Sequence, residues 1–245
     1  MSRRATGATA LRVLRQLRRD PRTIALIVVV PCLLIIVVDQ LFADREEVFQ
    51  QVGVPLLGLF PLVSMFLVTS ITMLRERTSG TLERLLALPL AKLDLLLGYA
   101  IAFAALATAQ GVVVSFVGFG LLGLETASST ALVVALAVAN AVLGMALGLF
   151  LSAYARTEFQ AVQFMPAFIL PQILLCGLLV PRDEMADWLQ WIAALLPFTY
   201  AYDALSRAAT ESTLDARFWL DVGVVLGVTA LALALGAATL RRRTP

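Results

Sequence analysis

Residues 130–154 read TALVVALAVANAVLGMALGLFLSAY and contain no charged side chain. An α-helix needs about 20 predominantly apolar residues to cross the roughly 30 Å hydrocarbon layer of a bilayer. Five other runs meet this requirement, at residues 23–42, 54–74, 95–122, 161–180 and 219–240. The sequence therefore predicts an all-α integral membrane protein with six transmembrane helices.

The composition of the whole chain supports this class of protein. Of its 245 residues, 60% are apolar and 15% are charged, and the mean hydropathy is +0.89. Soluble domains are about 45–50% apolar and about 25% charged, so a soluble globular protein is excluded. We divide the chain into a basic interfacial helix (residues 1–22), one six-helix membrane domain (residues 23–240) and a basic tail (residues 241–245).

The distribution of charge predicts that both ends of the chain lie in the cytoplasm. With that topology only four of the 19 Lys and Arg residues fall outside, namely Arg45, Arg182, Arg207 and Arg217. Cytoplasmic loops of membrane proteins carry an excess of Lys and Arg, so this topology agrees with the positive-inside rule. The basic N-terminus resembles a secretory signal, but no small-x-small cleavage site follows it closely, so we expect it to be retained.

Residues 9–19 have two faces when they are drawn as a helix. Leu11, Leu14 and Leu17 share one face, and the arginines at 12, 15, 18 and 19 gather mainly on the other. This pattern predicts an amphipathic helix on the inner leaflet, ended by Asp20 and Pro21. The alternative is a basic tail that is simply attracted to anionic lipid.

Small residues and prolines predict how the spans pack and bend. Small residues at four-residue spacing in the fourth span predict a seam where another helix approaches closely. They are Asn140, Gly144, Gly148 and Ser152. Pro166 and Pro171 predict a bend in the fifth span between Gln163 and Gln172.

Residues 181–218 are only moderately polar, and Pro197 divides them into two halves. Each half is too short to cross a membrane, and both carry interfacial aromatic residues, including Trp188, Trp191 and Tyr200. We expect two short re-entrant helices that dip into the outer leaflet. The alternative is a fully extracellular helical hairpin.

The most informative cytoplasmic segment is residues 75–90, which read RERTSGTLERLLALPL. Gly80 permits a sharp turn, and about two turns of helix follow before Pro89. Leu82, Leu85 and Leu86 form an apolar stripe that a groove on a partner protein could hold. The alternative is an ordinary interfacial turn helix.

This segment resembles the signature of type-2 ABC exporter permeases in Glu76, residues 80–83 (GTLE), residues 85–86 (LL) and Pro89. That family includes bacterial drug-resistance and polysaccharide-export subunits and is similar in design to the human ABC G subfamily. The resemblance extends over nearly the whole chain: a basic elbow helix, six spans and a coupling helix after the second span. The family often has a second acidic residue near Thr78, which is absent here.

The resemblance implies that residues 80–88 dock in a cleft of a separate nucleotide-binding ATPase subunit, which would bind ATP and Mg. The implied ATPase-coupling residues are Arg75, Glu76, Gly80, Thr81, Leu82, Glu83, Leu85 and Leu86. The sequence contains no Gly-x-x-x-x-Gly-Lys-Ser/Thr phosphate loop, so we expect no catalytic site in this chain. Two permease subunits, identical or related, and two ATPase subunits form the expected assembly.

By the same resemblance, the second and fifth spans line the substrate cavity. The implied lining residues are Met65, Thr69, Gln163, Phe164, Phe168 and Gln172. Such a lining suits an amphiphilic or drug-like compound, exported by alternating access across a bacterial plasma membrane. We expect contact with membrane lipid and none with nucleic acid.

Two other functions are open at this stage. One is export of a lipid or lipid-linked glycan, and the other is an ATP-independent channel or membrane scaffold. A membrane enzyme is disfavoured, because the chain has no His and no intramembrane pair of carboxylates for acid–base chemistry. The two cysteines, Cys32 and Cys176, have no metal-ligand spacing, so we expect no metal site.

Overall fold

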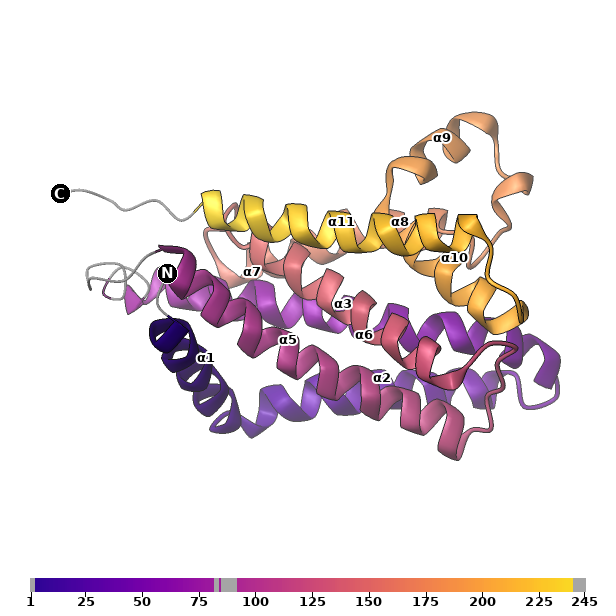
Figure 1. Ribbon diagram of the computed structural model, residues 1–245, viewed down its shortest axis with the longest axis horizontal. Coiled ribbons are helices and arrows are strands. Elements are labelled where there is room, and N and C mark those ends of the chain that lie inside the picture. Colours follow the sequence, from indigo (N-terminus) through magenta and orange to yellow (C-terminus); the bar gives the residue numbers. More distant parts are fainter. Residues whose placement is uncertain (1–2, 82–83, 85–91, 240–245) are drawn as a thin grey trace.

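The computed structural model of the chain describes residues 3–81, 84 and 92–239, and every regular element in these ranges is helical (Figure 1). The first half contains α1 (Arg3–Arg18), α2 (Pro21–Leu41), α3 (Glu46–Thr78), α5 (Lys92–Phe116), the π-helix η1 (Val117–Leu121) and α6 (Thr130–Leu151). The second half contains α7 (Glu158–Phe164), the π-helix η2 (Met165–Ile169), α8 (Leu170–Leu175), the 3-10 helix η3 (Arg182–Glu184), α9 (Asp187–Leu195), α10 (Pro197–Thr210) and α11 (Ala216–Ala238).

Five helices in the described residues are long and apolar enough to cross a membrane. They are Thr23–Leu41, Glu46–Thr78, Leu97–Leu121, Thr130–Leu151 and Ala216–Ala238. They run side by side along the length of the molecule (Figure 1). The chain is therefore an all-helical, multi-pass membrane protein, as five of the six apolar runs predict.

The fifth apolar run, residues 161–180, is broken into short pieces. It contains α7, η2 and α8, which are seven, five and six residues long. Pro166 lies in η2 and Pro171 at the start of α8, and each removes a backbone donor, so a regular α-helix cannot continue. The predicted bend coincides with this break, and the count of six spans stays a prediction.

The α3 helix is the central element of the bundle. It has 33 residues, so it is about 50 Å long and extends beyond a hydrocarbon layer at both ends. Glu46 and Glu47 in its first turn favour the longer helix, because acidic groups there interact well with the helix dipole. The helix is therefore longer at both ends than the apolar run at residues 54–74.

The predicted small-residue seam packs directly on α3. A Cβ atom at Gly144 would overlap the carbonyl oxygen of Leu62, and one at Gly148 would overlap that of Phe66. Asn140 lies on the same seam and donates from Nδ2 to the carbonyl oxygen of Ala201 at 3.3 Å. Glycine therefore permits a close approach between the backbones of α6 and α3.

The predicted elbow helix is present as α1, but its apolar face is not free for lipid. Ala10, Val13 and Leu17 are buried, and they belong to the same core cluster as Leu95 and Tyr99 of α5. The helix crosses one end of the bundle, close to α5 (Figure 1). Protein therefore covers Leu17 and part of Leu14, whereas Leu11 lies exposed on the arginine-rich face.

The segment between α8 and α11 has one buried and one projecting helix. Phe198, Ala201 and Leu205 of α10 are fully buried, and α10 contacts α3, α6 and α11. In contrast α9 projects from the side of the bundle (Figure 1), with Trp191 and Leu195 strongly exposed. Their depth in the outer leaflet stays a prediction.

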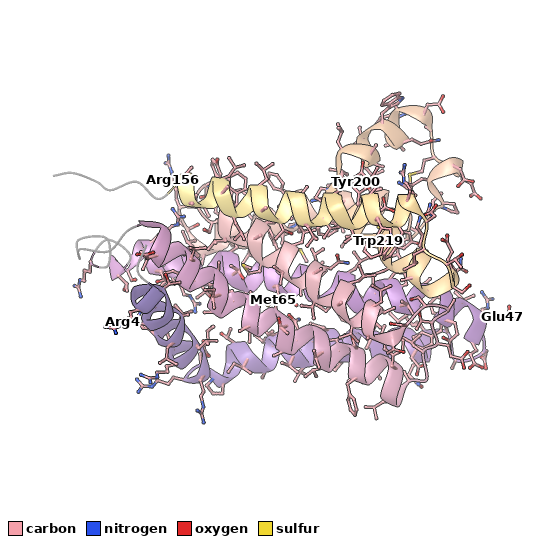
Figure 2. The ribbon with its side chains drawn as sticks, viewed as in Figure 1. Arg4, Glu47, Met65, Arg156, Tyr200 and Trp219 are labelled. Atoms are coloured by element: carbon pink, nitrogen blue, oxygen red, sulfur yellow. The ribbon has the colours of Figure 1, made fainter. Side chains whose placement is uncertain are left out.

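Charged residues separate toward the two ends of the molecule. Arg4 and Arg156 lie at one end, Glu47 lies at the other, and Met65 lies between them (Figure 2). The last turn of α3 and the end of α11 lie at the same end as α1 (Figure 1). We call this the basic end, and its cytoplasmic location stays a prediction.

Candidate functional site: a polar junction and an apolar groove

The last turn of α3 joins three neighbouring parts of the bundle through three consecutive residues. Arg75 pairs with Glu158 at the start of α7. Glu76 bonds to α1 and α5, and Arg77 Nη2 donates to Thr239 Oγ1 beyond α11 at 3.4 Å. We call this cluster the α3 junction. It lies immediately before Gly80 and the segment for which the sequence predicts ATPase docking.

Glu76 is the buried centre of the α3 junction, with only 4% of its side chain exposed. Tyr99 donates from its hydroxyl to Oε2 at 2.8 Å, and Gln16 donates from Nε2 to Oε1 at 3.0 Å. Arg12 Nη2 lies 3.5 Å from Oε2 and also donates to the Tyr99 hydroxyl. Both carboxylate oxygens therefore have partners within the subunit, as a buried charge requires.

The geometry of three helices brings these groups together. Arg12 and Gln16 are one turn apart on α1, so both point from the same face. Tyr99 lies near the start of α5, where α1 packs across it, and the Arg12 guanidinium is 5.6 Å from the centre of its ring. Sequence reasoning missed Gln16 and Tyr99 as partners of Glu76. The (i, i+4) spacing of Arg12 and Gln16 can be recognised in the sequence, but nothing in the sequence indicates that both contact Glu76.

Arg75 forms an exposed two-pronged ion pair with Glu158. Its Nε and Nη2 atoms donate to Oε1 and Oε2 at 2.8 and 2.9 Å. The hydrogen bonds from Arg75 lower the pKa of the Glu158 carboxyl below its ordinary value. The pair fastens the end of α3 to the start of the broken fifth run.

We expect Arg75→Gln to reduce stability by less than about 1 kcal/mol, because both partners are about half exposed to solvent. A lowered carboxyl pKa stabilises the fold above the ordinary value near 4.3 and loses that effect as the pH falls through the lowered value. The difference between wild type and variant should therefore be present at about pH 7 and disappear in acid, as the pH falls through the lowered pKa of Glu158. Unfolding temperatures across this range measure it, and a difference that grows in acid would contradict the assignment.

The structure describes only part of the predicted coupling segment. Gly80 has a φ of 72°, in the left-handed region that favours glycine, so the predicted sharp turn is confirmed. Thr81 follows it, and its Oγ1 lies 3.0 Å from Ser79 Oγ. Leu82, Glu83, Leu85 and Leu86 lie outside the described residues. Their contact with an ATPase stays a prediction.

The six predicted cavity residues do not share one surface of the subunit. Met65 and Thr69 are fully buried inside the bundle, and Met65 belongs to a core cluster with Tyr99 and Phe103. In contrast Gln163 and Phe168 are exposed, and Phe164 is half-buried. Gln172 is buried and donates from Nε2 to the carbonyl oxygen of Phe168 at 2.9 Å.

A different face of α3 lines an apolar groove of about 540 Å³. Thr23, Leu26, Val30, Pro31 and Leu34 line it from α2, and Met165 and Ile173 line it from η2 and α8. The α3 side is formed by Phe60, Val63, Ser64, Leu67, Val68, Ile71, Thr72 and Arg75. The groove therefore lies between the first, second and fifth apolar runs, and Met65 and Thr69 do not line it; whether it is the predicted substrate cavity stays a prediction.

This groove ends at a residue of the α3 junction. Arg75 lines the groove and pairs with Glu158, so one side chain belongs to both features. Such a groove is large enough for a drug-sized molecule and offers it mainly apolar contacts with a few hydroxyl groups. The arrangement links a candidate ligand surface to the root of a candidate docking segment.

Long apolar helices, an apolar groove between them and a polar junction at one end are the features of a multi-pass membrane protein. The chain belongs to the ABC-2 type transporter family, which matches residues 4–209. The resemblance of the segment after the second span to type-2 ABC permeases is thereby confirmed.

Three named proteins are similar in sequence to this chain. The probable multidrug ABC transporter permease YbhR of Escherichia coli K12 is 29% identical over 188 residues, which cover 77% of this chain and 51% of YbhR. The linearmycin resistance permease protein LnrN of Bacillus subtilis 168 is 24% identical, over 69% of this chain and 44% of LnrN. The ABC transporter G family member 20 of Dictyostelium discoideum is 28% identical, over 56% of this chain and 19% of that protein. The chain thus spans about half the length, or less, of these relatives.

Proposed function

We propose that this chain is the permease subunit of an exporter that moves an amphiphilic or drug-like compound out of a bacterial cell, powered by ATP hydrolysis on a separate subunit. The observation that carries the proposal is the apolar groove between α2, α3 and the broken fifth run. The names of two relatives, a probable multidrug permease and a linearmycin resistance permease, support the same class of substrate.

The α3 junction supplies a mechanical path for coupling. An ATPase subunit that binds ATP and Mg would hold residues 80–88 and move them as it closes. Because α3 continues almost to Gly80, that movement reaches α7 through Arg75 and α1 and α5 through Glu76. The bundle then rocks as a unit between inward-facing and outward-facing states.

A second permease copy completes the transport pathway in this proposal. The α2 helix is the least buried of the five candidate spans, with 17% of its apolar window buried. The groove beside it is therefore open at the surface of the single subunit, where a second permease, identical or related, would close it. In this proposal the protein lies in a bacterial inner membrane, with both ends of the chain on the cytoplasmic side.

Filling the groove tests the substrate assignment. We expect Leu67→Trp to reduce export severalfold, because a larger ring occupies space that the substrate needs. The matched control is Val112→Trp, which adds the same ring to an exposed site on α5. Export of a fluorescent amphiphile into inverted vesicles, supplied with the ATPase and ATP, gives the measurement. Equal export by Leu67→Trp and Val112→Trp would remove the groove from the proposal.

The coupling segment is tested by reversing the charge of Glu83 and placing a charge in the apolar stripe at Leu85. We expect Glu83→Arg with Leu85→Asp to abolish ATP-dependent export and co-purification of the ATPase, while membrane insertion is retained. Unchanged transport would instead favour an ATP-independent channel or scaffold. Intact coupling with transport of a lipid or lipid-linked glycan, but of no drug-like compound, would favour the other exporter class.

A further inference from the structure

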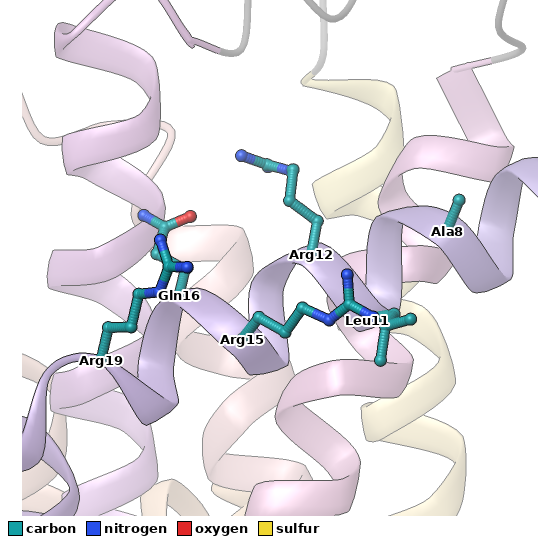
Figure 3. A pocket seen from close by; sticks show the side chains of 6 residues that line it. All are labelled: Ala8, Leu11, Arg12, Arg15, Gln16 and Arg19. Atoms are coloured by element: carbon teal, nitrogen blue, oxygen red, sulfur yellow. The ribbon is translucent and has the colours of Figure 1, made fainter.

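An open groove of about 520 Å³ lies on the exposed face of α1 (Figure 3). Among the described residues it is lined by Ala8, Leu11, Arg12, Arg15, Gln16 and Arg19. These positions recur every three or four residues, so they form a single stripe along the helix. We propose that this stripe binds the headgroup of an anionic phospholipid from the cytoplasmic leaflet.

The stripe carries positive charge that the described residues leave largely uncompensated. Arg15 and Arg19 are exposed, and no carboxylate in residues 3–81, 84 and 92–239 forms an ion pair with either. The nearby Asp20 caps α2, where it accepts hydrogen bonds from the backbone N and the Oγ1 of Thr23 at 3.2 and 2.7 Å. A phosphate group is the natural complement, because guanidinium groups donate to phosphate oxygens in pairs.

The position of the stripe specifies a lipid as the source of that phosphate. Arg19 is two residues before α2, which begins at Pro21. Val29 and Leu33 of α2 are exposed and do not line the apolar groove, so hydrocarbon chains contact α2 about three turns beyond Arg19. Arginines at this depth lie at the level of lipid headgroups.

The buried face of α1 excludes the other way of binding lipid. An amphipathic helix that enters a leaflet buries its apolar face among the acyl chains. In this chain α5 covers that face, and Leu11 is the only strongly exposed leucine of the described part of α1. The contact of α1 with lipid is therefore with the headgroup, through arginine.

Arg12 connects the lipid site to the α3 junction. It lines the groove, keeps 34% of its side chain exposed and also pairs with Glu76. A bound phosphate and the Glu76 carboxylate therefore share one guanidinium. Anionic lipid then alters how firmly α1 holds the root of the coupling segment.

The test is lipid retention by the full purified chain, measured by native mass spectrometry. Phosphatidylglycerol and phosphatidylcholine of the same chain length are titrated into the detergent-solubilised protein. We expect wild type to retain phosphatidylglycerol in preference to phosphatidylcholine. The variant Arg15→Gln/Arg19→Gln should bind phosphatidylglycerol roughly 30-fold more weakly, since each basic residue near an anionic surface contributes about 1 kcal/mol. Its affinity for phosphatidylcholine should not change.

The matched control is Arg45→Gln/Arg156→Gln, which removes two exposed arginines away from α1. This control should retain phosphatidylglycerol as wild type does. Equal retention of the two lipids by wild type, or equal losses in both double variants, would overturn the proposal. So would unchanged lipid retention with loss of ATPase co-purification in Arg15→Gln/Arg19→Gln, because the stripe would then be a protein contact. The readout involves no transport, so its outcome is independent of the exported compound.

Discussion

Replacing Arg12 with leucine should lower the unfolding temperature of the purified chain by roughly 6–12 °C, and replacing Glu76 with glutamine in the same chain should restore most of it. The reason is the burial of Glu76. Arg12→Leu leaves a carboxylate with 4% exposure and no cation, and breaking a buried ion pair in this way costs about 3 kcal/mol. Arg12→Leu/Glu76→Gln leaves no charge at position 76, and the new amide can still bond to Tyr99 and Gln16.

Thermal unfolding in detergent measures this recovery directly. Arg4→Leu serves as the matched control, because Arg4 lies exposed on the same helix. We expect Arg4→Leu to change the unfolding temperature by little. If Arg12→Leu is no worse than Arg4→Leu, or if the double variant is no better than Arg12→Leu alone, Glu76 does not depend on Arg12 as the structure indicates.

Replacing Gly144 with alanine should be still more damaging. We expect it to lower the free energy of unfolding by about 3 kcal/mol or more, which prevents normal accumulation in the membrane. The added Cβ overlaps the backbone carbonyl of Leu62, and a backbone atom cannot move aside as a flexible side chain can. Helices α3 and α6 must then separate. The groove and the α3 junction are both built on α3, so export should be lost together with stability.

A glycine on α11 provides the matched control for this substitution. A Cβ at Gly227 meets nothing within 4 Å, so Gly227→Ala should be neutral or stabilising by up to about 1 kcal/mol through helix propensity. The amount of folded protein in detergent extracts, followed by gel filtration, compares the two variants. Similar yields for Gly144→Ala and Gly227→Ala would show that the α3–α6 seam tolerates separation.

Sequence reasoning identified the small-residue face of α6, though not α3 as its partner, and it did not identify the α3 junction. A glycine ladder at four-residue spacing lies on one face of a helix whatever surrounds it, so the seam follows from local geometry. The partners of Glu76 come from helices 60 and 23 residues away in the chain. Which residues meet across such a separation depends on the rotation and height of each helix in the bundle.

The apolar groove shows the same limit in another form. Residues of α3 one or two positions apart face different directions, so Met65 is buried in the core while Ser64 and Leu67 line the groove. The groove is lined from the second and fifth runs and also from α2, and its role as a substrate cavity stays a prediction. Packing of α6 against Leu62 and Phe66 decides which other face of α3 is left to line the groove.

Residues 130–154, by themselves, were sufficient to predict a membrane-spanning helix, and Thr130–Leu151 is a helix long and apolar enough to be one. A backbone in hydrocarbon must satisfy its own hydrogen bonds, so a long apolar run has few alternatives to a helix. The turn at Gly80 was likewise local, because only glycine adopts that conformation readily. Tertiary structure alone decided that α5 covers Ala10, Val13 and Leu17 of α1, that Arg75 reaches Glu158 and that Glu76 is buried. Each of these depends on contacts between distant segments, which hydropathy and spacing do not specify.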